Sequence, residues 1–216
     1  MAIAFDATST GSANASSVTV AHTVTGSNPF LFVVIRDLDN LLTGVTYASV
    51  AMTQIGTTQG AGGNNVSLWY LVNPATGTNN IVATKSAGVS NIRASGTSYT
   101  GVSQGAPEAS TTGAGGAGTT FSQSVTTITD NAWVVWGLGE NTGSPPTAGA
   151  NTTSRITDGA ATAIFDAGGA VTPAGSKTLN ASTAVSADAW GGTIVSIAPA
   201  AATVALPFRA LLGVGI

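Results

Sequence analysis

The chain has 216 residues, of which six are Lys or Arg and nine are Asp or Glu, giving a formal net charge of −3. Ordinary domains contain roughly a quarter charged residues, whereas Gly, Ala, Ser and Thr dominate here. The lack of cysteine excludes a disulfide scaffold, a zinc–thiolate site and a thiol nucleophile, and the scattered basic residues exclude the positive stripe that nucleic acids require.

Apolar and polar residues alternate with a period of two along much of the chain, a pattern typical of half-buried β-strands. Residues 17–24 place three valines and His22 on one face and small residues on the other. Residues 29–36 are almost continuously apolar, which predicts a central strand covered on both faces. Further strands are predicted over residues 43–48, 50–57, 65–72, 79–85, 91–100, 119–128, 132–140, 161–166, 176–183 and 189–198.

These elements predict an all-β fold, an antiparallel β-sandwich of the jelly-roll type. The Ala-rich stretches are interrupted by Gly, Thr and Pro, which disfavour helix. We expect one domain over residues 1–199, in which the Gly-rich residues 105–118 form a flexible loop; a pair of smaller sandwiches is the alternative. Residues 200–216 are expected to form an extended apolar C-terminal tail.

Two tryptophans lie close together in the strand predicted over residues 132–140. Trp133 and Trp136 are separated by an odd number of positions, so in a regular strand they face opposite sides. One is therefore expected in the core, and the other against a second layer, a partner or a ligand.

Several segments together resemble a group of jelly-roll, concanavalin-like domains of bacteriophage virion proteins and bacterial surface proteins. The resemblance is one of texture and order over residues 3–199, and it implies a sandwich used for display, decoration or carbohydrate contact, with no shared catalytic residues. The segments that carry it are residues 5–9, 18–24, 30–35, 44–47, 52–55, 68–74, 98–104 and 194–199.

Two patterns of known chemistry fail in their context. Residues 101–105 match the nucleophile elbow around Ser103, but that elbow requires a turn from strand to helix, and Pro107 with a Gly-rich stretch follows here. Residues 113–118 match the glycine spacing of a dinucleotide-binding loop, which requires a helix after it, whereas residues 119–125 are predicted as strand.

The titratable residues offer few candidate sites. His22 is the only histidine, so it is the only histidine base available, and its alternation places it among core valines. Asp37, Asp39 and Asn40 could offer oxygens to Ca²⁺ or form an ordinary Asp/Asn turn. A glycosidase requires two carboxylates roughly 5–10 Å apart, and nothing in the sequence brings Glu108 and Glu140 together. No cofactor is expected.

The start of the chain lacks the basic and apolar regions of a signal peptide, and no apolar run is long enough to span a bilayer. We therefore expect no membrane association, and synthesis in the host cytoplasm followed by assembly into a virion.

The apolar tail is the strongest functional indication, because exposed apolar segments of this size usually mark a contact. Alternation within it also suits addition of a strand to a neighbour; folding back over its own sandwich is the alternative. The residues expected to make contacts are Val204, Leu206, Phe208, Leu211, Leu212 and Ile216.

These features predict a non-enzymatic structural protein of a phage virion, a head decoration or fibre subunit that assembles through sandwich edges and its tail. The expected partners are further copies of the chain, as a homo-oligomer, and a capsid or tail protein. The alternative is a carbohydrate-binding or adhesive module at a cell surface, including a bacterial surface filament subunit, with Trp136, Tyr70 and Tyr99 stacking on a glycan. A hydrolase using His22 is the third hypothesis.

Overall fold

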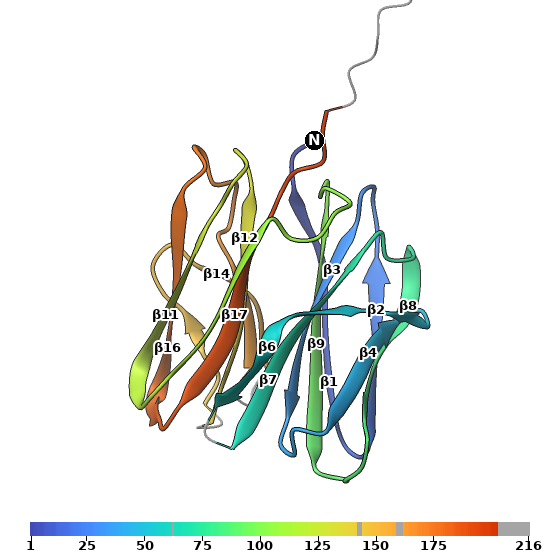
Figure 1. Ribbon diagram of the computed structural model, residues 1–216, viewed down its shortest axis with the longest axis vertical. Helices are drawn as coiled ribbons and strands as arrows, with labels where there is room; N and C mark the ends of the chain where they lie inside the picture. Colours follow the sequence, from blue (N-terminus) through green and yellow to red (C-terminus); the bar gives the residue numbers. More distant parts are fainter. Residues whose placement is uncertain (62, 142–143, 159–161, 203–216) are drawn as a thin grey trace, which may run out of the picture.

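The computed structural model describes residues 1–61, 63–141, 144–158 and 162–202 (Figure 1). Within these residues the regular structure consists of antiparallel β-strands in four sheets, which confirms the predicted all-β sandwich architecture. The same residues include no helix with the length and apolar character needed to cross a membrane.

The first half of the molecule, β1 to β9, has an inner and an outer sheet. In spatial order, the inner sheet contains β1 (Ala4–Asn14), β9 (Asn91–Thr100), β3 (Phe30–Asp37), β7 (Asn64–Val72) and β6 (Thr53–Ala61). The outer sheet contains β2 (Ser17–Val24), β8 (Gly77–Lys85), β4 (Leu42–Tyr47) and β5 (Val50–Ala51).

The second half, β10 to β17, is also built from two sheets. Its inner sheet contains β10 (Ala109–Gly115), β17 (Trp190–Ile197), β12 (Trp133–Glu140), β15 (Thr162–Asp166) and β14 (Thr153–Asp158). Its outer sheet contains β11 (Gly118–Thr126), β16 (Ser176–Ala187) and β13 (Thr147–Ala148).

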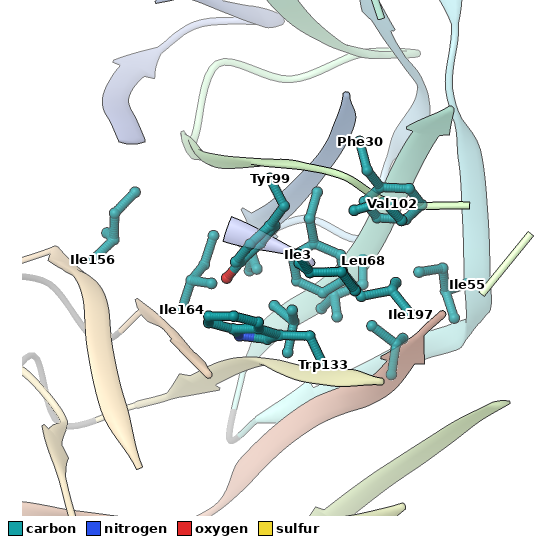
Figure 2. Packing of buried hydrophobic residues seen from close by; sticks show 14 of the residues in the cluster. Ile3, Phe30, Ile55, Leu68, Tyr99, Val102, Trp133, Ile156, Ile164 and Ile197 are labelled. Atoms are coloured by element: carbon teal, nitrogen blue, oxygen red, sulfur yellow. The ribbon is translucent and has the colours of Figure 1, made fainter. Parts of the chain in front are cut away.

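The four sheets stack as layers, which run in Figure 1 from β2, β4 and β8 on the right to β11 and β16 on the left. Each half has its own core between its inner and outer sheets. A third core fills the space between the two inner sheets and draws residues from both halves (Figure 2). The domain expected over residues 1–199 therefore consists of two sandwiches joined through a shared core.

The alternation patterns predicted the burial of individual strands correctly. β2 alternates exposed and buried residues along its whole length, and β3 is buried on both faces because it lies between two cores. Trp133 contributes to the shared core and Trp136 to the core of the second half. The two tryptophans thus face opposite sides, as their spacing predicted.

The two halves have the same strand order. The inner sheets read β1-β9-β3-β7-β6 and β10-β17-β12-β15-β14, and the outer sheets share the order β2-β8-β4 and β11-β16-β13. Each strand of the second half therefore has a counterpart in the first. A matching sequence accompanies this order, because residues 4–11 read AFDATSTG and residues 106–113 read APEASTTG.

A carboxylate in the first of these segments holds three parts of the first half together. Asp6, at a bulge in β1, accepts hydrogen bonds from the Thr25 backbone N–H at 2.9 Å and the Ser98 hydroxyl at 2.7 Å, and a short one from the Thr25 hydroxyl. Burial alone would raise the pKa of Asp6, but these hydrogen bonds outweigh it and lower the pKa below its ordinary value. The ionised carboxylate thus links β1 to β9 and to the turn after β2.

The second half repeats this arrangement with a glutamate. Glu108 accepts hydrogen bonds from the backbone N–H groups of Ile128 at 2.9 Å and Thr129 at 3.1 Å, and from the Ser196 hydroxyl at 2.6 Å. Burial opposes ionisation here as well, and the hydrogen bonds again lower the pKa. Equivalent carboxylates with equivalent partners, at matching places in sequence and strand order, identify the two halves as an internal duplication.

The halves are related by an approximate two-fold axis. β1 contacts β14, while their counterparts β10 and β6 also contact each other. The contact of β7 with β17 is likewise matched by that of β15 with β9, and β3 contacts its own counterpart β12. Such reciprocal contacts define an isologous interface, the type found in symmetric dimers. The chain thus has the construction of a two-fold dimer within one polypeptide.

The prediction of a flexible loop over residues 105–118 is wrong. Most of this stretch is the edge strand β10, which pairs with β17 from Ala109 to Gly115. Its small residues leave room for bulky neighbours, because a Cβ at Gly115 would collide with the Trp190 indole. The sequence prediction also missed β1, β13 and β14, which lack a clear apolar alternation.

Candidate functional site

A hollow lies among the described residues at the end of the molecule where the chain start and residues 198–202 come together; Figure 1 shows this end at the top. Its volume is about 740 Å³. The chain start, the segment after β9, two loops of the second half and the segment after β17 line it. The lining residues are Met1, Ala2, Ile3, Ser103, Thr129, Asn131, Ala170 and 198–202.

The two segments that follow the last strand of each half form one side of this hollow. Val102 and Pro199 form an antiparallel bridge. The Ser103 N–H donates to the Ala198 carbonyl at 2.9 Å, and the Ala200 N–H donates to the Gly101 carbonyl at 2.8 Å. The segments that end the two halves therefore lie side by side at this hollow. Residues 203–216 follow the second of these segments in the sequence.

The lining of the hollow is largely apolar, and the Met1 α-ammonium, which donates to the Ala200 carbonyl at 2.7 Å, is a charged group beside it. Among its described lining residues none has a titratable side chain, and the polar ones are Ser103, Thr129 and Asn131. Such a lining can hold an apolar segment of chain. The six tail residues predicted to make contacts, Val204 to Ile216, lie outside the described residues.

The predicted glycan platforms are wrong for two of the three aromatic residues. Trp136 and Tyr99 have no exposed surface, because β12 and β9 are interior strands of sheets covered on both faces. Tyr70 is half-buried and stacks on Phe30, with ring centroids 5.7 Å apart. Period two fixes which residues share a face, but it does not reveal that another sheet covers that face.

His22 is a packed histidine of the first half. Its side chain is buried, its Nδ1 lies 2.8 Å from the Ser9 hydroxyl, and its ring meets Tyr47 edge to face. Burial lowers the pKa of His22 to about 4, although the nearby Asp6 carboxylate acts in the opposite direction. The imidazole is therefore neutral at pH 7 and held within the core.

This lowered pKa predicts a loss of stability in acid. Between the unfolded pKa of 6.5 and the folded pKa of about 4, the unfolded chain binds a proton at His22 and the folded chain does not. The free energy of unfolding therefore decreases as the pH is lowered through this window, by about 2 kcal/mol from pH 7 to pH 5. Urea unfolding at both pH values measures the change.

The His22→Gln variant is the control, because an amide can bond to Ser9 without titrating. We expect its stability to change little over the same interval. An equal loss in the wild type and His22→Gln would contradict the assignment to His22.

The carboxylates of the turn after β3, considered above as calcium ligands, contact the ammonium group of a lysine. Lys85 is buried, and its ammonium lies 3.5 Å from an Asp37 oxygen and 3.1 Å from an Asp39 oxygen. Asp37 also accepts the backbone N–H groups of Asp39 at 3.1 Å and Leu41 at 2.6 Å. The oxygens considered for Ca²⁺ thus bind an ammonium and backbone donors. Asn40 has a positive φ of 54°, as such turns allow.

Glu108 and Glu140 lie far apart along the same sheet. Glu108 bonds to Ser196, which pairs with Val134, whereas Glu140 pairs with Trp190 at the far end of the ladder. Six residues of strand separate the two levels, about 20 Å, which is beyond the reach of a glycosidase pair. Among the described residues no group of three or more His, Asp or Glu could hold a metal ion.

A polar cluster that no sequence pattern indicated lies between the two inner sheets. The Tyr99 hydroxyl donates to Asp166 at 3.0 Å, and Arg155 forms a short ion pair with the same carboxylate. The Arg155 guanidinium also lies over the Phe5 ring, 4.5 Å from its centroid. Burial, and then the Asp166 charge, raise the pKa of Tyr99 well above its ordinary value, so the hydroxyl stays protonated. The cluster joins the halves, since two members come from each.

Comparisons with known proteins do not extend this description. A scan against models of protein families, a search of curated proteins and a search of solved structures each find no match.

Proposed function

We propose that this protein is a non-enzymatic structural component of a phage virion, a head decoration or fibre subunit that assembles with copies of itself and with a capsid or tail protein. The observation that carries the proposal is the largely apolar hollow lined by residues 198–202, directly before the C-terminal segment. An apolar segment that follows in sequence directly after residues lining such a hollow suits a contact with another chain.

The strand order supports the jelly-roll type for each half. In a jelly roll, eight strands wind as two Greek keys, so that the first pairs with the eighth, the second with the seventh, and so on inward. In the first half β1 pairs with β9, β2 with β8, β3 with β7 and β4 with β5, while β6 extends the inner sheet beyond β7. In the second half the corresponding pairs are β10 with β17, β11 with β16 and β12 with β15. The duplication then provides two such modules, in line with the resemblance to virion and surface domains.

The composition of the outer surfaces also supports an assembly role. The exposed residues of β2 are Ser, Thr and Ala, and those of β11 are Ser and Thr. Such faces can approach another protein without desolvating charged groups, which is the costly step in burying a polar surface.

The experiment measures binding to virus particles. Particles released by cells that carry the gene are purified and incubated with the full chain, with a chain that ends at residue 202, and with an Ala198→Asp variant, which places a charge in the hollow. We expect the full chain to sediment with the particles and the two altered chains to lose most of this binding.

Val89→Asp is the matched control, because Val89 is 74% exposed in the turn after β8, far from the hollow. It should bind like the wild type. A full chain that is absent from particles and does not bind them would contradict the virion assignment, and equal binding by all four chains would contradict the role of the hollow.

A carbohydrate-binding or adhesive module at a cell surface is the second candidate. A polar hollow of about 430 Å³ on the outer sheet of the first half, lined by Thr46, Thr78, Asn79 and Asn80 among others, favours it. A glycan array that gives a hit lost on Asn80→Ala would support this candidate over the first.

A further inference from the structure

We infer that β2 and β11 are docking edges at which copies of this chain pair strand to strand. The inference rests on the proposed assembly function and names its partner as a second copy of the chain. An edge strand leaves N–H and C=O groups unpaired, and soluble proteins protect such edges with charges, bulges, short strands or a covering element.

The other edges among the described strands are protected. At the inner sheets, β1 lies against β14, and β6 lies against β10. The pairings of β1, β6 and β14 also contain register shifts. At the outer sheets, β5 and β13 have only two residues each. The long edges that remain at the outer sheets are β2, with eight residues, and β11, with nine. β2 contacts β1 and β11 contacts β10, the neighbouring strands of the inner sheets, without strand pairing. The register shift of β11 lies between Gly118 and Thr120, so its ladder is regular from Thr120 to Thr126.

The open backbone groups of β2 can be identified from its pairing with β8. The Lys85 N–H donates to the Ser16 carbonyl at 2.8 Å, so Ser16 and every second residue after it direct their backbone groups toward β8. The intervening residues direct theirs away from β8, toward the open edge. These are Ser17, Thr19, Ala21 and Thr23.

The same reasoning applies to β11. The Thr127 N–H donates to the Gly175 carbonyl at 2.9 Å, continuing the ladder between β11 and β16. Residues at even positions of β11 therefore direct their backbone groups away from β16. These are Thr120, Ser122, Ser124 and Thr126.

The two edges match each other and suit a second copy as their partner. Each offers four open residues at the same spacing, each is unbroken over these residues, and the side chains are small, exposed and uncharged. No charge repels a like edge, and no large side chain blocks its approach. Since one edge lies on each outer sheet, a copy paired at both edges joins two neighbours, which extends the assembly into an open chain.

The experiment removes one N–H donor from each edge. Proline is tolerated on an edge strand where its missing N–H faces outward, so Thr19→Pro and Ser122→Pro leave the ladders to β8 and β16 intact. Thr19→Val and Ser122→Val are the controls, because they keep the N–H and favour strands. Assembly of the full chain is followed by sedimentation velocity over a range of concentrations and by electron microscopy, with circular dichroism to verify folding.

We expect the wild type and both valine variants to form chains of copies, and the double proline variant to remain a single folded chain. Each single proline variant distinguishes two modes of pairing. If β2 pairs with β2 and β11 with β11, blocking one edge leaves dimers; if β2 pairs with β11, blocking either edge leaves monomers. The concentration for half-assembly should rise at least about tenfold with each proline, the equivalent of one lost hydrogen bond at the strong end of the usual range.

If the folded proline variants assemble at the same concentration as the wild type, the inference about the edges is overturned. The proposed virion function still stands in that case, provided that these variants bind the particles. If a chain that ends at residue 202 assembles at a lower concentration than the full chain, the C-terminal segment of the same chain occupies the edges. That result also overturns the inference. A full chain that neither self-assembles nor binds particles contradicts both.

Discussion

Replacing Gly137 with valine is expected to lower the free energy of unfolding by about 3 kcal/mol, the upper part of the range for an overpacked core. Gly137 lies in β12, where the two inner sheets meet. A Cβ at this position would lie 2.5 Å from Val34 Cγ2 and 2.7 Å from Leu68 Cδ1. These side chains are buried and belong to the shared core, so they have little room to move.

The duplication supplies a rescue for this variant. Phe30 is the first residue of β3 and pairs near the end of β9, just as Trp133 is the first residue of β12 and pairs at the end of β17. Val34 and Gly137 each lie four residues further along, so they occupy equivalent positions in the two halves. They meet near the approximate two-fold axis, one large and one small. Exchanging them, as Val34→Gly with Gly137→Val, should recover at least half of the lost stability, because the total volume is restored.

Urea unfolding of the two single variants and the double variant measures this coupling. Each single variant should be less stable than the exchange: Val34→Gly loses buried side-chain volume, and Gly137→Val adds it. Strictly additive losses in the double variant would contradict the direct packing of these two positions. They would also argue against the two-fold relation between the halves.

Replacing Asp166 with alanine is expected to lower the free energy of unfolding by about 3–5 kcal/mol, since breaking a buried ion pair leaves an uncompensated charge. The carboxylate is fully buried, whereas the Arg155 side chain is 18% exposed. Without Asp166, the guanidinium and the Tyr99 hydroxyl both lose their partner at the surface that joins the halves. Thermal or urea unfolding reports the loss.

Tyr99→Phe is the matched control for this variant. It removes one hydrogen bond and keeps both the ring and the ion pair, so its cost should be about 1 kcal/mol. If Asp166→Ala cost no more than Tyr99→Phe, the buried ion pair would not contribute to the joining of the halves as described.

The sequence predicted much of the fold because strands with a covered face have a visible period. The valines of β2, the continuous apolar run of β3 and the opposed tryptophans of β12 all behave as their spacing predicted. β1 and β10 were missed for the opposite reason. They are strands because of the backbones they pair with, and their small polar side chains have no such period.

The candidate site was less accessible from the sequence. The carbohydrate-binding alternative placed Trp136 and Tyr99 against a glycan, yet adjoining sheets cover both. A comparison of residues 4–11 with 106–113 would have revealed the duplication and, with it, that each half repeats the other's sheets. Even then, the cluster of Phe5, Tyr99, Arg155 and Asp166 would have stayed hidden, because it unites four distant segments.

By itself, then, the amino-acid sequence determined the all-β class, the strands with strong alternation and the near absence of charge. Tertiary structure alone decided that two similar sandwiches meet across a two-fold axis, which aromatic rings are enclosed, and which strands remain at an open edge. The physical reason is that side-chain periodicity records which way residues point along one strand. What covers that face, or pairs with that edge, depends on segments about a hundred residues away.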